Sequence, residues 1–147
     1  MLANIYWAVL NVRVRLTRVK ELILVGLGGG LGAISRFQLG LWIQAQFASA
    51  LPIATLAVNL IGCFLIGILA GLGEKRGILT PETRVFLVTG VLGGFTTFSA
   101  FGVETFALLR GGRLALALLY VGLSVGGGIL LVTLGWAIIG NKNPANG

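Results

Sequence analysis

Four long apolar segments limit what this chain can fold into. They cover residues 22–43, 53–72, 84–109 and 114–140, and each reaches the roughly 20 residues that a helix needs to cross a bilayer. Hydrophobic residues make up 56% of the chain and charged residues 10%, whereas a soluble domain carries about 25% charge. We therefore expect an all-α integral membrane protein in which four transmembrane helices are joined by short connections.

The sequence divides into three parts around these segments. Residues 1–21 form a basic N-terminal extension, which we expect to be an interfacial helix or an irregular start to the chain. Its apolar patch precedes its charges, which is not the order found in a signal peptide. Residues 22–140 form the transmembrane domain, and residues 141–147 form a polar tail.

The net charge of +7 comes from lysines and arginines that mostly flank the apolar segments. This placement favours anionic lipid headgroups over nucleic acid as their partner. Eight of these cations lie on the N-terminal side of the membrane: four before the first segment, three from the end of the second segment to the first residue of the third, and one in the tail. Arg110 and Arg113 lie on the opposite side, so the positive-inside rule places the N-terminus in the cytoplasm.

The residues that carry most enzymatic chemistry are scarce. The chain has no histidine, four acidic residues and one cysteine, Cys63, which lies in an apolar run. Histidine is the commonest general base and a common metal ligand, and one cysteine makes neither a disulfide framework nor a thiol cluster. We therefore do not expect an enzyme.

The third apolar segment is interrupted by an unusual sequence, Gly93-Gly94-Phe95-Thr96-Thr97-Phe98-Ser99-Ala100-Phe101. Adjacent glycines weaken a helix, and Thr and Ser hydroxyls offer the backbone alternative hydrogen bonds. Non-helical backbone at membrane depth persists where it is buried in protein or lines a wet cavity. We therefore expect the third helix to be broken mid-membrane. The alternative is that these small residues serve close helix packing alone.

Glycines and one arginine distinguish the first segment. Gly26 and Gly30, and likewise Gly28 and Gly32, have the spacing that lets another backbone approach closely. Arg36 lies within the span, where a charge at mid-bilayer costs about 2.5–3.5 kcal/mol. Its side chain either reaches the interface or a wet vestibule, or it binds a ligand directly.

Two other segments carry neutral polar residues on one helix face. Thr55 and Asn59 are four residues apart in the second segment, and Tyr120 and Ser124 are four apart in the fourth. The Asn59 amide is costly in lipid unless it bonds to another helix or faces a pore. Neutral hydrogen-bond donors suit an anion that must lose its water and still leave quickly.

Aromatic rings and freed carbonyls add two possibilities at the break. Phe98 and Phe101 share a helix face, and their positive ring edges can contact a small anion, although core packing is the alternative. The carbonyl oxygens that a break frees are ligands for a hard cation. One break offers about two such oxygens, so two copies around a two-fold axis would supply about four. This arithmetic points to a symmetric dimer.

Three motifs together resemble the Fluc/CrcB fluoride channels. They are the sequence from Gly93 to Phe101, the upstream Val58-Asn59-Leu60-Ile61-Gly62, and Gly30-x-Gly32-Ala33-x-x-Arg36 in the first segment. Their order and spacing agree with the family over residues 22–140. The resemblance implies an antiparallel, dual-topology homodimer in the cell inner membrane, with two pores and a central structural sodium ion. Its expected function is the passive export of toxic fluoride.

The resemblance also implies roles for individual residues. Backbone oxygens of Gly93 and Thr96 would bind the sodium ion, and Arg36 and Glu104 would lie at a vestibule or pore mouth. The fluoride pathway would be formed by Asn59, Phe98, Phe101, Ser99, Thr97, Tyr120, Ser124 and Thr55. Of the two hydroxyls in the break, that of Ser99 is expected to face the pore. One position departs from the family: a serine often follows one turn after Ser124, and here that residue is Gly128.

Two rival functions make different demands on the polar residues. A small four-helix drug/proton exchanger, which also forms antiparallel dimers, needs a membrane-embedded acid, for which Glu104 is the candidate. A purely structural membrane subunit would not need Asn59, the glycine pair and the polar face of the fourth segment together. The charge asymmetry leaves the dimer partner open, because a paralogous subunit of opposite orientation also fits.

Overall fold

The computed structural model describes residues 2–139, with side chains from Arg18 on. Over this range the chain is helical and has no strand. The elements are α1 (Leu2–Gln46), α2 (Ile53–Gly71), the π-helical η1 (Leu72–Arg76), α3 (Pro81–Arg84), the π-helical η2 (Val85–Leu92), α4 (Gly93–Phe95), α5 (Phe98–Arg110) and α6 (Leu114–Ala137). Four helical stretches are long and apolar enough to cross a membrane: Arg18–Gln46, Ile53–Arg76, Pro81–Arg110 and Leu114–Ala137. The predicted all-α protein with four membrane-spanning helices is confirmed.

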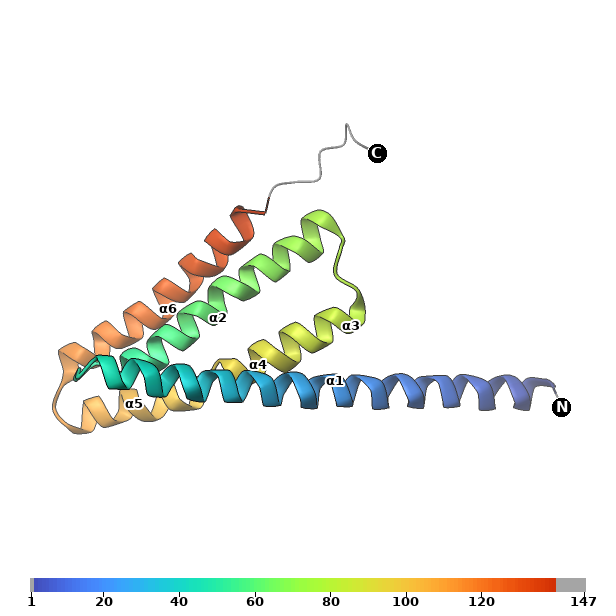
Figure 1. Ribbon diagram of the computed structural model, residues 1–147, viewed down its shortest axis with the longest axis horizontal. Coiled ribbons are helices and arrows are strands. Elements are labelled where there is room, and N and C mark those ends of the chain that lie inside the picture. The colour runs from blue at the N-terminus through green and yellow to red at the C-terminus, as the bar shows by residue number, and fades with distance from the viewer. Residues whose placement is uncertain (1, 140–147) are drawn as a thin grey trace, which may run out of the picture.

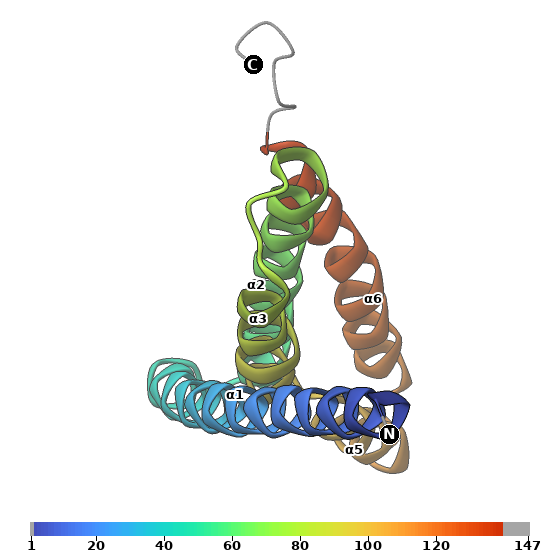
Figure 2. The ribbon, with the colours of Figure 1, turned by 90° about the vertical axis from the view of Figure 1, so that its right-hand side faces the viewer.

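The helices pack mainly in two pairs. α2 packs along α6, and α1 packs along η2 and α4. Figure 1 shows both pairs, and the N-terminal part of α1 extends beyond the other helices. In Figure 2, α2 and α6 rise away from α1 and α5. Because α2 also touches α4 and α5, the junction between these two short helices lies beside α2.

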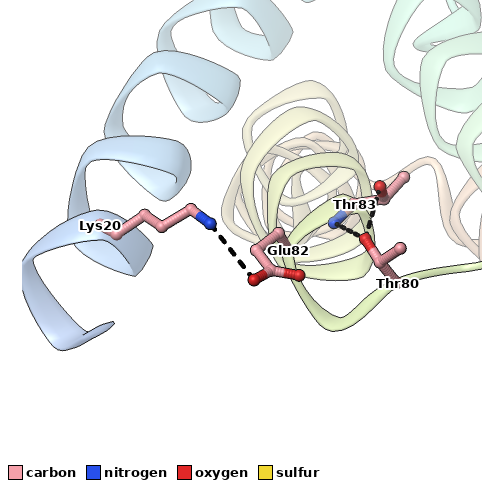
Figure 3. Close-up of polar contacts among 4 residues, drawn as sticks. All are labelled: Lys20, Thr80, Glu82 and Thr83. Carbon is pink, nitrogen blue, oxygen red and sulfur yellow. Dashed lines mark hydrogen bonds and ion pairs between the residues drawn. The ribbon is translucent and has the colours of Figure 1, made fainter. Parts of the chain in front are cut away.

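α1 starts much earlier than the first span expected from the sequence. It is one continuous helix from Leu2 to Gln46, so the N-terminal extension is helical and belongs to the same element as the span. Figure 3 shows how α1 meets the start of α3, where Lys20 Nζ pairs with Glu82 Oε1 at 3.2 Å. The backbone N–H of Thr83 donates to Thr80 Oγ1 at 3.2 Å and caps α3.

Two glycines of α1 allow the third span to pack against it. A Cβ on Gly28 or on Gly32 would overlap backbone atoms of η2, so only glycine fits at these two positions. The other predicted pair behaves differently. A Cβ on Gly26 or on Gly30 would meet no atom within 4 Å in the described part of the chain. The packing prediction therefore holds for Gly28 and Gly32 within this chain.

Gly32→Ala is expected to destabilise the protein by about 1–3 kcal/mol, the usual cost of overpacking. The added methyl group would press on the Val91 carbonyl, and backbone cannot move aside as a flexible side chain does. Gly40→Ala in the same helix is the matched control, because a Cβ there meets nothing within 4 Å. Thermal unfolding in detergent compares the variants, and equal midpoints would contradict this account of the packing.

The turn after α2 contacts the C-terminal end of α6. Lys75 Nζ donates to the carbonyl oxygens of Trp136 and Ile139, both at 2.9 Å, and lies 3.4 Å from the centre of the Trp136 ring. Trp136 Nε1 donates in turn to Glu74 Oε2 at 3.1 Å. A lysine at a helix C-terminus satisfies carbonyls that have no partner within the helix. Gly77, with φ +64°, then reverses the chain toward α3.

Candidate functional site

The third span is interrupted between α4 and α5 by two extended residues. Thr96 has φ −82° and ψ 159°, and Thr97 has φ −149° and ψ 115°. The hydroxyls on either side of the junction bond to nearby backbone. Thr96 Oγ1 donates to the Leu92 carbonyl at 3.0 Å, and Thr97 Oγ1 accepts from Ala100 N at 3.3 Å and caps α5. The junction therefore lies at the two threonines.

The break was expected from the glycine pair and the hydroxyls together, and the part of this explanation that rested on the glycines was wrong. Gly93 and Gly94 are both helical and belong to α4. Gly94 is needed for another reason, because a Cβ there would overlap the backbone of Gly29 in α1. Glycine costs little when close packing repays its lost helix propensity. Gly94 lets α4 come close to α1, and the chain leaves the helix two residues later.

Asn59 of α2 holds the extended backbone through both ends of its amide. Its Nδ2 donates to the Thr97 carbonyl at 2.9 Å, and the Thr97 N–H donates to its Oδ1 at 2.8 Å. These bonds replace the helical partners that the peptide groups lose at the junction. Of the two readings offered for Asn59, the interhelical bond is observed. The residue also lines a cavity, described below.

Arg36 of α1 satisfies a second carbonyl at the junction. Its Nε donates to the Gly94 carbonyl oxygen at 3.1 Å. In a continuous helix that oxygen would accept from the backbone N–H four residues later, which is Phe98. The Arg36 side chain is half-buried. In this structure it provides a hydrogen-bond donor for a carbonyl at the C-terminal end of α4.

A cavity of about 370 Å³ lies beside the junction, between α2, the third span and α6. The predicted site residues in its lining are Asn59, Gly93, Thr96, Thr97, Phe98, Phe101 and Ser124. Most of the remaining lining is apolar, including Ile66, Val88 and Leu92. The cavity therefore places a few neutral polar groups in a largely apolar wall.

Three aromatic rings form a row that leads away from the surface. The centroids of Phe98 and Phe101 are 5.5 Å apart with a tilt of 40°, and those of Phe101 and Tyr120 are 5.3 Å apart with a tilt of 50°. Phe98 is 83% exposed, whereas Tyr120 is fully buried. Tilted rings present their positive edges, not only their faces, to the space beside them.

Glu104 of α5 joins two polar residues that the sequence placed on separate helices. Thr55 Oγ1 donates to Glu104 Oε1, and Tyr120 Oη donates to Glu104 Oε2, both at 2.6 Å. The carboxylate also lines a second cavity of about 410 Å³, together with Pro52 and Arg113. The Thr55 and Tyr120 hydroxyl hydrogens are thus committed to the carboxylate, which leaves neither hydroxyl free to donate to another anion.

Known proteins match most of this chain. The family described as "CrcB-like protein, Camphor Resistance (CrcB)" matches residues 23–136. The chain belongs to the CrcB family. Two relatives named "Fluoride-specific ion channel FluC" come from Methylobacillus flagellatus and Thermus thermophilus. They are 46% and 48% identical over 120 and 122 residues, which cover 81% and 83% of this chain and 94% and 95% of theirs.

A third FluC, from Chlorobium chlorochromatii, is 45% identical over 118 residues, or 80% of this chain and 91% of its own. The resemblance to the CrcB family is therefore confirmed. Together with the four spans, membership makes this chain a multi-pass protein of the plasma membrane. The first 22 residues, which begin the long helix α1, lie outside the matched region.

Most of the site residues predicted for this CrcB protein form two separate groups in the structure. One set lines the cavity at the junction, while Thr55, Tyr120 and Glu104 form the hydroxyl–carboxylate cluster. Between the two hydroxyls of the junction, Thr97 lines the cavity, and Ser99 is exposed outside its lining with its Oγ 3.3 Å from Thr97 Oγ1. Within this chain Thr97 lines the cavity and Ser99 does not, and the expectation that Ser99 is the hydroxyl facing the pore stays a prediction.

Two features of the site were missed from the sequence. Cys63, treated there only as an unpaired cysteine, lines the cavity at the junction. The link from Glu104 to Thr55 and Tyr120 was also missed. A signal for this link was present, because an acid inside a membrane span needs a partner, and hydroxyl groups within the spans are the available donors.

Proposed function

We propose that this chain is a fluoride channel through which fluoride leaves the cytoplasm passively. The observation that carries the proposal is the cavity at the junction, where Asn59, Ser124 and two phenylalanines, Phe98 and Phe101, line one largely apolar space. Neutral donors and ring edges can replace the water around a small anion without trapping it. The printed names of the relatives support fluoride as that anion.

The rival drug/proton exchanger receives less support from the geometry. An exchanger needs a membrane-embedded carboxylate that binds protons and cations in turn. Both oxygens of Glu104 already accept hydrogen bonds from Thr55 and Tyr120. A carboxylate with these two hydrogen bonds holds Thr55 and Tyr120 in place. We therefore propose neither exchange nor catalysis for this chain.

We also propose that two copies, or this chain and a paralogous subunit, form an antiparallel dimer. Phe98 is 83% exposed although it belongs to the aromatic row, and Gly93 is exposed at the cavity. A large apolar side chain next to a functional cavity is expected to be covered when the protein is assembled. The charge asymmetry between the two membrane faces makes the paralogous partner a real alternative to a homodimer.

A structural sodium ion fits the carbonyl groups at the junction. The Thr97 N–H, which would donate to the Gly93 carbonyl in a continuous helix, donates to Asn59. The Gly93 and Thr96 carbonyl oxygens would bind the ion. Its positive charge would compensate for the helical hydrogen bonds that these carbonyls lack at the junction. No cluster of three or more His, Cys, Asp or Glu side chains occurs in the described residues.

Thr96→Ala is expected to preserve the dimer and its dependence on sodium, because the substitution leaves the carbonyl oxygen in place. A bulky substitution, Gly93→Leu, is expected to disrupt both, since residue 93 is exposed at the proposed interface. Size-exclusion chromatography in sodium and in a large organic cation measures the dimer. Equal loss of dimer in the two variants would contradict a sodium site built from backbone oxygens.

Fluoride efflux from liposomes that contain the purified protein tests the proposed function, with chloride efflux as the control. Fast, fluoride-selective efflux from the protein alone would establish both the channel and a functional homodimer. Well-folded protein that gives no efflux alone, but does so when co-expressed with a paralogue, would establish the heterodimer. Proton-coupled uptake of organic cations without fluoride efflux would overturn the proposal in favour of an exchanger.

A further inference from the structure

Two cavities meet on the same side of α6. The cavity at the junction and a neighbouring cavity of about 380 Å³ share Cys63, Ser124 and Val125 in their linings. This neighbouring cavity, which is not the one beside Glu104, continues along α6 to Val132 and Thr133. The shared residues make the two cavities consecutive parts of one groove between α2 and α6.

Few hydrogen-bond donors are free in the second part of this groove. The Ser124 hydroxyl oxygen is buried and has no hydrogen-bond partner among the described residues. Thr133 Oγ1 donates its hydrogen to the Ile129 carbonyl at 2.9 Å. Thr133 therefore has no hydrogen left to donate, whereas Ser124 and Cys63, which also line the neighbouring cavity, have no hydrogen-bond partner among the described residues.

The Cys63 thiol lies against the position where α6 has no side chain. Tyr120, Ser124 and Gly128 follow each other at intervals of four residues along one face of α6. A Cβ on Gly128 would lie 3.2 Å from Cys63 Sγ. The sulfur atom of α2 thus fills the space that a side chain on α6 would otherwise occupy.

We infer that the Cys63 thiol lines the anion route and is the hydrogen-bond donor that follows Ser124 along it. The inference rests on the proposed function and adds a residue to the route. A thiol is a weak donor on a small, polarisable side chain, so it can stabilise a passing anion without holding it. The route would then run from the junction along the groove between α2 and α6, past Gly128.

Substitutions at Cys63 distinguish the effect of hydrogen-bond donation on efflux from the effect of side-chain size. Cys63→Ser keeps a donor at this position, and its efflux is expected to exceed that of Cys63→Ala. Cys63→Ala removes the donor and is expected to slow efflux about fivefold, a factor typical of one lost hydrogen bond. Cys63→Leu fills the groove and is expected to stop efflux. Wild-type efflux from both alanine and leucine variants would overturn the inference.

Chemical modification provides a second readout on the folded wild-type protein. Methyl methanethiosulfonate converts a thiol to a methyl disulfide with release of methanesulfinate, and Cys63 is the sole cysteine of the chain. We expect modification, confirmed by intact mass, to block fluoride efflux, and Cys63→Ser to be insensitive. A thiol that does not react in the conducting protein, or reacts without any loss of efflux, would overturn the inference. Absence of efflux from untreated protein would instead count against the proposed function.

Discussion

Asn59→Leu will abolish fluoride efflux and lower the thermal stability of the protein. Leucine has the same branched shape as asparagine, although it is larger, but it leaves the N–H and the C=O of Thr97 without the partners they have now. An unsatisfied buried polar group costs about 1–3 kcal/mol, and water is scarce at membrane depth. Liposome efflux and thermal unfolding in detergent measure the two losses.

Asn59→Asp separates the two hydrogen bonds in the stability measurement. A carboxylate can still accept from the Thr97 N–H, but it cannot donate to the Thr97 carbonyl when ionised. Its unfolding midpoint should therefore lie between those of the wild type and Asn59→Leu. A leucine variant that conducts and unfolds like the wild type would show that the extended backbone does not depend on Asn59.

Phe98→Ile and Phe101→Ile will each reduce fluoride efflux at least about tenfold, equivalent to about 1.4 kcal/mol on the barrier. Isoleucine keeps the apolar surface but has no ring edge to offer an anion. Phe98 gives the cleaner result, because a side chain that is 83% exposed contributes little packing within its own chain. Efflux is compared at equal amounts of folded protein, judged by size-exclusion chromatography.

Phe106→Ile is the matched control for the phenylalanine variants. Phe106 lies on the same helix, α5, and is 63% exposed, but it does not line the cavity at the junction. Its substitution should leave efflux unchanged. If all three variants conduct alike, whether fast or slowly, ring edges at Phe98 and Phe101 are not part of the route.

Hydropathy predicted the number of spans well, and it predicted their limits less well. Apolar length is a property of each segment alone, so four spans were visible without any neighbour. The basic stretch before residue 22 looked like a separate extension because hydropathy falls there, yet the helix passes through it without a break. The role of Gly94 was misinterpreted for a related reason. The need for glycine at this position comes from its contact with Gly29, which lies in another helix.

The arrangement of the candidate site could not be predicted from the sequence, and the roles of its residues stay predictions. Helical spacing placed Tyr120 and Ser124 on one face, but it could not tell which faces meet in space. Tyr120 is hydrogen-bonded to Glu104, whereas Ser124 lines the cavity and its buried Oγ has no partner among the described residues. Similarly, Arg36 was recognised as unusual, but its acceptor, the Gly94 carbonyl, appears only once α1 and α4 are packed together.

The interrupted third span has an electrostatic consequence. The helical stretch from Pro81 to Phe95 ends at the junction with its carbonyl end, and α5 begins there with its amide end. Peptide dipoles give these ends roughly half a negative and half a positive elementary charge. One pair of extended residues therefore separates a side that attracts cations from a side that attracts anions. Backbone dipoles do not titrate, so this separation persists at every pH at which the fold is intact.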